Sequence, residues 1–307
     1  MQPLRGIALK VMAVFMFMGM ASLIKAASAD VPPGQAVFFR SFFALPIILG
    51  WLAMRGELRH GWKTDNPVGH FWRGLIGTSA MGLGFTGLGL LPLPEVTAIG
   101  YAAPLLVVVF ASMFLNEQVG LYRLSAVGLG MIGVLIVLSP RLSIGASLST
   151  GETLGAVVVL MGAVFAALAQ VFVRKLVQTE ATAAIVFWFT ITSSVLALCT
   201  IPWGWAMPSF AAAIMLIFAG LLGGIGQIFL TSSYRYADAS LVAPFDYTSM
   251  ILALIIGYFV FDEVPTGTML LGAGIVITAG VLIIWRERVL GLQRAQQRKA
   301  MGHVGGK

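Results

Sequence analysis

The sequence has 307 residues, of which 59% are hydrophobic and only 10% are charged, and its mean hydropathy is +0.95. A soluble globular domain carries about 25% charged residues, so this composition excludes a water-soluble fold. The formal net charge of +7 does not indicate a nucleic-acid-binding protein, because the cationic residues fall in short loops and in the tail rather than along one face of a domain.

Ten apolar stretches are each close to the ~20 residues that a helix needs to cross a bilayer. In chain order they cover 4–26, 35–54, 70–91, 95–115, 120–139, 152–177, 181–203, 208–231, 238–261 and 267–285. Most connections between them are too short to hold a soluble domain. We therefore predict an all-α polytopic membrane protein with ten transmembrane helices.

The first stretch, 4–26, also has features of a cleaved signal peptide. Arg5 precedes an apolar core, and the run AASA at 26–29 resembles a cleavage site. Lys25 lies directly beside that site, however, and the first half of the chain needs this stretch to complete five helices. We expect it to be retained as a transmembrane helix.

The second stretch carries Arg40 about five residues inside its outer end. One interpretation is that the long side chain reaches outward to the headgroups. The other is that Arg40 faces a cavity, where it holds a carboxylate or phosphate or pairs with Glu95 at the start of the fourth stretch. The sequence leaves both interpretations open.

Uncharged polar side chains also mark the interior of the predicted bundle. Gln170 in the sixth stretch and Gln227 in the eighth must find hydrogen-bond partners in protein, water or a solute. Tyr101 and Tyr247 lie on the equivalent fourth and ninth stretches, and an aromatic lining suits a planar or amphipathic solute. All four are candidates for solute binding.

Asp246 lies about eight residues, or ~12 Å, into the ninth stretch. An ionisable group near the middle of a bilayer costs several kcal/mol unless it is paired or wetted, so Asp246 is a functional candidate by default. It would bind a cationic or hydrogen-bonding solute, or carry a coupling proton. The structural alternative is a buried partner for a backbone donor freed by Pro244.

The sequence predicts no catalytic, cofactor or metal site. The glycine-rich runs at 74–89 and 220–226 lack the Gly-Lys-Ser/Thr pattern of a phosphate loop and favour close helix packing. His60 and Asp65 match the spacing of some acyltransferases, but no domain surrounds this short match. The histidines are scattered and make no metal set.

The two halves of the chain repeat each other at a constant offset of 146 residues, which relates Gly74 to Gly220 and Glu117 to Glu263. With the N-terminus in the cytoplasm, sixteen of the 19 Lys and Arg lie on the inner side and two on the outer side. Both termini are therefore expected in the cytoplasm. Because each half has five helices, the second repeat is expected to be inverted relative to the first.

The pairs Asn116-Glu117 and Asp262-Glu263 each end the fourth helix of a half. We expect Asn116 and Asp262 to cap the fifth helices, with the two glutamates in the first turn, where the helix dipole favours negative charge. The predicted units are 1–145 and 146–290, two five-helix repeats, followed at 291–307 by a basic cytoplasmic tail on anionic headgroups.

These paired motifs, the glycine-rich fifth helices after them and the runs APFDYTS at 243–249 and FDEVP at 261–265 carry a resemblance. The chain resembles the ten-helix members of the EamA branch of the drug/metabolite transporter superfamily, over essentially its whole length. The resemblance implies a carrier of small metabolites in a bacterial inner membrane. It also implies a central cavity lined mainly by helices 1, 3, 4, 6, 8 and 9.

We expect a secondary transporter that moves a small organic metabolite by alternating access; a vitamin such as riboflavin, an amino acid and a nucleoside-like compound remain open. The alternatives are a proton-coupled drug or metabolite efflux pump, a channel or scaffold, and an intramembrane enzyme. The expected partners are the solute and the lipid bilayer, with no nucleic acid and no cofactor, and a homodimer is left open. The candidate substrate-binding residues are Asp246, Arg40, Tyr101, Tyr247, Gln170, Gln227 and Glu95.

Overall fold

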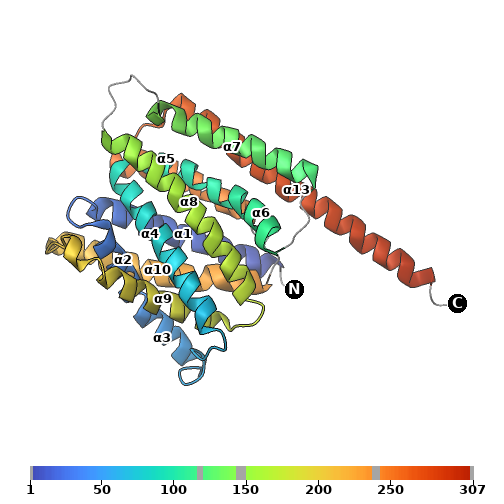
Figure 1. The fold of residues 1–307 in the computed structure, drawn as a ribbon, viewed down its shortest axis with the longest axis horizontal. Coiled ribbons are helices and arrows are strands. Elements are labelled where there is room, and N and C mark those ends of the chain that lie inside the picture. Colours follow the sequence, from blue (N-terminus) through green and yellow to red (C-terminus); the bar gives the residue numbers. More distant parts are fainter. Residues whose placement is uncertain (1–2, 116–119, 143–149, 237–242, 305–307) are drawn as a thin grey trace.

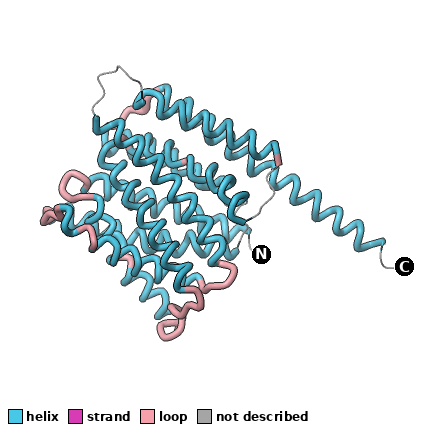
Figure 2. The backbone as a smooth tube through the Cα atoms, in the orientation of Figure 1, coloured by secondary structure: helices cyan, strands magenta, loops and turns pink. Residues whose placement is uncertain are grey.

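The structure is a computed structural model that describes residues 3–115, 120–142, 150–236 and 243–304, and these form helices and loops (Figure 2). The helices of the first half are α1 (Pro3–Ala27), α2 (Pro33–Phe42), α3 (Leu45–Met54), α4 (Pro67–Leu90), α5 (Leu93–Gly100), α6 (Ala102–Leu115) and α7 (Leu121–Leu142). Those of the second half are α8 (Thr150–Leu176), α9 (Thr182–Leu198), the short 3-10 helix η1 (Ile201–Trp203), α10 (Phe210–Tyr236), the 3-10 helix η2 (Ala243–Tyr247), α12 (Thr248–Phe261) and α13 (Gly267–Val304).

The ten predicted membrane crossings are confirmed. Within the described residues, six helical segments are long and apolar enough to span a bilayer: α1, α2 with α3, α5 with α6, α7, α8 and α10. The other four crossings are the 24-residue α4 and three shorter apolar helices, namely α9, α12 with the end of η2, and the first part of α13.

Two of the crossings are broken by proline. Pro46 has no N–H to donate to the carbonyl of Phe42, so α2 ends at Phe42 and α3 restarts at Leu45. Pro104 leaves the carbonyl of Gly100 without its donor in the same way, and the chain breaks at Tyr101 between α5 and α6. The break between α2 and α3 was not expected from the sequence, because that segment remains apolar throughout.

The helices pack in pairs that the repeat relates to each other. α1 packs along α10 and α4 packs along α8, and shifting by one repeat turns the first pair into the second. α7 and α13 form a peripheral pair along one edge of the bundle, and α13 then continues beyond the bundle (Figure 1). The boundary expected at 145/146 lies outside the described residues.

The α7–α13 contact depends on glycine. A methyl group on Gly272 would lie 2.6 Å from the carbonyl oxygen of Gly133, and one on Gly133 would lie 2.8 Å from the carbonyl oxygen of Gly272. The two backbones therefore touch, as small residues allow in lipid, where helix association depends on close packing.

Gly272→Ala is expected to destabilise the protein, because overpacking costs about 1–3 kcal/mol. Gly274→Ala is the matched control on the same helix, since a methyl group there meets nothing within 4 Å. Melting temperatures of the purified proteins in detergent check this. Equal melting temperatures for the two variants would show that the backbones do not touch.

The expected N-cap at Asp262 is wrong. Asp262 adopts a left-handed conformation (φ 54°) and ends α12, while the amide of Glu263 donates to the carbonyl of Gly257 in a helix C-terminal motif. α13 begins only at Gly267, and Thr266 caps it by accepting a hydrogen bond from the amide of Met269 at 3.2 Å. Asn116 and Glu117 lie outside the described residues.

Candidate functional site

A central cavity of about 920 Å³ lies between the two repeats. Its walls come from α1, α4, the α5–α6 break, α8, α10 and the η2–α12 segment, with single contributions from α2 and α9. These are the six crossings that the family resemblance implied, plus Arg40 of α2 and Phe189 of α9. Small-molecule sites in proteins have volumes of ~300–1,000 Å³, so the cavity can enclose a metabolite.

Among the described residues, the cavity wall reaches the surface at the end of the bundle where α8 finishes. We call this the Lys10 end; α1 begins there and α13 leaves the bundle there (Figure 1), and its mouth residues are Arg174, Gln178 and Tyr234. Gln178, beyond the last turn of α8, is exposed. We call the opposite end, where α1 finishes, the Lys25 end.

A thin apolar layer separates the cavity from the Lys25 end. Met20 and Met81 line the central cavity, whereas Ile24 and Phe85, one helical turn further along α1 and α4, line a separate pocket of about 240 Å³. All four belong to one packed hydrophobic cluster. The layer is therefore about one turn, or ~5.4 Å, thick.

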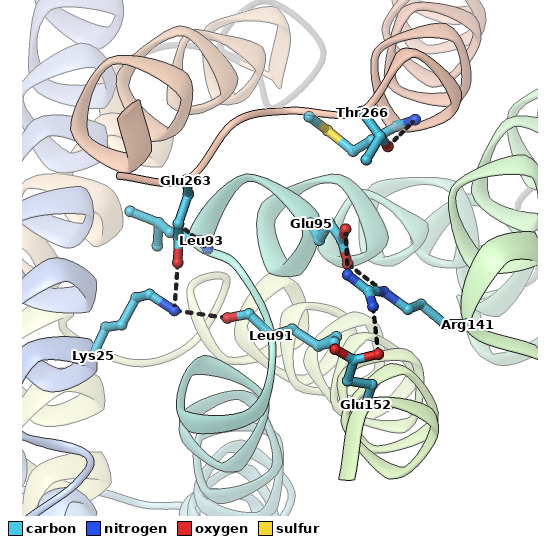
Figure 3. A network of polar contacts seen from close by, with 9 residues as sticks. Lys25, Leu91, Leu93, Glu95, Arg141, Glu152, Glu263 and Thr266 are labelled. Atoms are coloured by element: carbon cyan, nitrogen blue, oxygen red, sulfur yellow. Dashed lines mark hydrogen bonds and ion pairs between the residues drawn. The ribbon is translucent and has the colours of Figure 1, made fainter. Parts of the chain in front are cut away.

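Ion pairs reinforce the closed end (Figure 3). Lys25 Nζ lies 2.9 Å from Glu263 Oε1 and donates to the carbonyl oxygens of Leu88 at 3.2 Å and Leu91 at 2.8 Å. The second oxygen of Glu263 accepts from the amide of Leu93 at 2.8 Å. Because Lys25 belongs to the first repeat and Glu263 to the second, this network ties the two repeats together.

Glu95 belongs to the same end and does not line the cavity. Its carboxylate accepts two hydrogen bonds from Arg141, at 3.0 and 3.1 Å, and Arg141 also contacts Glu152 at 2.6 Å (Figure 3). The alternative in which Glu95 pairs with Arg40 is therefore wrong.

Asp246 lines the cavity and pairs with Lys10. Lys10 Nζ lies 2.8 Å from Asp246 Oδ1; the lysine side chain is 3% exposed and the aspartate side chain 38% exposed. Asp246 sits in η2, immediately before α12, so its carboxylate stands at an interruption of regular helix. Sequence reasoning missed Lys10, although its position inside the first apolar stretch was a usable signal.

Arg40 also lines the cavity, and a second arginine, Arg73 of α4, accompanies it. Their guanidinium carbons lie 5.5 Å and 4.0 Å from the ring centre of Phe189. From the sequence, Arg73 and Lys10 count among the cationic residues on the inner side of the membrane, because each lies only a few residues inside an apolar stretch. That assignment hid their place in the cavity wall.

The two tyrosines meet where the repeats meet. The rings of Tyr101 and Tyr247 are 5.1 Å apart in an edge-to-face arrangement, and the hydroxyl of Tyr101 shares a 2.7 Å hydrogen bond with that of Ser249. Tyr101 and Ser249 line the cavity, whereas Tyr247 is buried behind Tyr101. Tyr247 can thus orient Tyr101 from behind.

The two glutamines reach the cavity from α8 and α10. Gln170 of α8 is exposed to it, and Gln227 of α10 is buried and donates to Thr231 at 3.4 Å. Five of the seven residues singled out from the sequence therefore line one cavity: Asp246, Arg40, Tyr101, Gln170 and Gln227.

Comparison with known proteins gives consistent matches. The model of the EamA-like transporter family matches residues 4–139 and 153–285. A solved crystal structure, 18% identical, shares the fold with a TM-score of 0.67 over 93% of this chain and 98% of its own.

Named relatives cover most of the chain. The S-adenosylmethionine uptake transporter of Rickettsia felis is 27% identical over 83% of each chain. The riboflavin transporter of Rhizobium johnstonii is 29% identical over 83% of this chain and 82% of its own. The pseudopaline exporter CntI of Pseudomonas aeruginosa is 30% identical over 91% of this chain and 95% of its own.

Proposed function

Because the chain belongs to the EamA-like transporter family, we propose that it is a secondary transporter that carries a small organic metabolite across a bacterial inner membrane by alternating access. Its relatives are transporters rather than enzymes. The observation that carries the proposal is the central cavity, which is open at the Lys10 end and closed by one helical turn at the Lys25 end.

The inverted repeats supply the second conformation. Exchanging the conformations of two inverted halves converts a state open at one end into a state open at the other. The α1–α10 and α4–α8 pairs correspond under this exchange, so the same packing surfaces serve both states.

The charge distribution supports an orientation. With the Lys10 end in the cytoplasm, the sequence puts sixteen of the 19 Lys and Arg on the inner side, and fourteen remain there once Lys10 and Arg73 are assigned to the cavity, as the positive-inside rule favours. In that orientation the structure is the inward-open state. The relatives include both uptake and export proteins, so family membership does not set the direction of transport.

The test is exchange in proteoliposomes. Vesicles loaded with unlabelled S-adenosylmethionine, riboflavin or a metabolite mixture are diluted into trace labelled solute. A carrier gives saturable uptake that depends on unlabelled solute inside; a channel gives uptake that does not saturate. Flux without this dependence would overturn the proposal.

A proton-coupled efflux pump is the second candidate, and the Lys10–Asp246 pair in the cavity favours it, because a paired carboxylate in a cavity can carry a coupling proton. We expect Asp246→Asn to distinguish the roles. A proton carrier would lose transport driven by a pH gradient but keep exchange of solute, whereas a solute-binding residue would lose both.

A further inference from the structure

Two buried arginines in the central cavity have no counter-ion among the described residues. Arg40 is 3% exposed and Arg73 is 6% exposed. In the part of the chain that the structure describes, Nε and Nη1 of both guanidinium groups lack a hydrogen-bond acceptor. An unpaired buried cation costs several kcal/mol, so two of them side by side require an explanation.

The two guanidinium groups converge on one ring. Both lie near the face of Phe189, so their central carbons are no further apart than the sum of the 5.5 Å and 4.0 Å distances to its centre. Cation–π contact recovers about 2 kcal/mol or somewhat more at a desolvated site, and it provides no hydrogen-bond acceptor. The ring therefore holds the arginines in place without satisfying their N–H groups.

Glycines at equivalent positions of the two repeats make room for these groups. A methyl group on Gly77 of α4 would collide with Arg73 Nη1, and one on Gly223 of α10 would lie 3.0 Å from Arg40 Nε. The guanidinium groups thus fill the spaces that the glycines leave, beside the cavity.

The cavity wall as a whole also carries an excess of positive charge. Four cationic side chains line it, those of Lys10, Arg40, Arg73 and Arg174, against the single carboxylate of Asp246 among the described residues. That carboxylate is already paired with Lys10 at 2.8 Å. A cleft lined by one sign of charge concentrates ligands of the opposite sign.

We propose that Arg40 and Arg73 form an anion subsite, and that the transported solute carries an oxyanion group, a carboxylate or a phosphate, which binds between them. Each guanidinium presents a planar fork of N–H donors that matches the oxygens of either group. The bound anion supplies the missing acceptors and relieves the repulsion between the two cations. This inference rests on the proposed transport function and adds the chemical class of the solute.

The primary test measures the melting temperature of the purified full-length protein in detergent, in chloride and then in succinate or inorganic phosphate at equal ionic strength. We expect one of the two oxyanions to raise the melting temperature by about 2–4 °C. Arg40→Gln and Arg73→Gln should abolish the rise. Arg59→Gln, at an exposed site on the loop between α3 and α4, is the control that should keep it.

A second variant keeps the proposal testable if a glutamine variant fails to fold. Arg73→Met removes one of two repelling charges while keeping an apolar side chain against Phe189, so in chloride it should melt no lower than the wild type. If neither oxyanion raises the wild-type melting temperature, or if the rise persists in both arginine variants, the subsite is overturned. A lower melting temperature for Arg73→Met would also count against it.

The two proposals fail in different ways. Exchange of neutral riboflavin in proteoliposomes without any oxyanion effect would overturn the subsite and leave transport standing. An oxyanion effect that both arginine variants lose would support the subsite, whether or not vesicle experiments detect solute exchange. The larger of the succinate and phosphate effects identifies which acid group the solute carries.

Discussion

Asp246→Asn is expected to reduce transport by about 100-fold, a loss that corresponds to about 2.7 kcal/mol, because it removes the one carboxylate that the described residues place in the cavity wall. The substitution keeps the shape of the side chain but leaves Lys10, which is 3% exposed, without its partner. Initial rates of solute exchange in proteoliposomes measure the loss, and the melting temperature shows whether the protein still folds.

The double variant Lys10→Gln/Asp246→Asn separates function from stability. It removes both charges together, so no uncompensated ion remains and the melting temperature should return toward that of the wild type. Transport should stay lost, because the cavity has lost its only described carboxylate. Recovery of transport in the double variant would show that the pair is a structural tie.

A matched control is available near the same end of the bundle. Arg55 and Glu57 form an ion pair at 3.2 Å with side chains 48% and 39% exposed. Exposed pairs contribute ~0–1 kcal/mol, so Arg55→Gln/Glu57→Gln should leave both exchange and melting temperature unchanged. The contrast between the two double variants isolates the effect of the cavity.

Glu263→Gln is expected to shift the protein toward the state open at the Lys25 end. Lys25 holds α1 to Glu263 of the opposite repeat and to the carbonyl groups at the end of α4, and this end must separate for the cavity to open there. Weakening the network by about 1.4 kcal/mol changes the population ratio of the two states tenfold.

Cysteine labelling can detect that shift. Cys199 is the only cysteine, so Cys199→Ser gives a clean background in which Thr97→Cys reports from the cavity wall. A membrane-impermeant thiol reagent applied from the Lys25 side should label Thr97→Cys about tenfold faster when Glu263→Gln is also present.

Glu95→Gln is the control for that experiment. The Glu95–Arg141 contact lies at the same end but joins α5 to α7 within the first repeat, and Glu95→Gln leaves the contact from Arg141 to Glu152 of the second repeat in place, so it should not change the balance between the states. Equal labelling rates in Glu263→Gln and in its parent would show that the Lys25 network does not hold the Lys25 end closed.

The candidate site could be predicted in part. Asp246 stood out because a charge deep in an apolar segment is costly wherever it points, and this argument needs only the distance along the helix. Lys10 and Arg73 sit closer to helix ends, where long cationic side chains can reach water. The predicted topology is therefore the same whether Lys10 and Arg73 reach the inner surface or face a cavity, so the sequence could not identify them as cavity residues.

Which charged side chains pair with each other could not be predicted from the sequence. Arg40 had two possible environments, and the glutamate considered as its partner binds Arg141 instead. Glu263 looked like a first-turn residue of the last helix, but the left-handed turn at Asp262 directs it toward Lys25. Both outcomes depend on the rotation and depth of helices far apart in the chain, which hydropathy does not encode.

By itself, the sequence determined the membrane location, the ten crossings and the two repeats, because bilayer-spanning length, hydropathy and repeat spacing are all local properties of the chain. Only the tertiary structure decided that Arg40 and Arg73 share the ring of Phe189, that Lys10 binds Asp246, and which end of the cavity is closed. The physical reason is that a charge in lipid must find its partner across helix interfaces, and only packing brings those interfaces together.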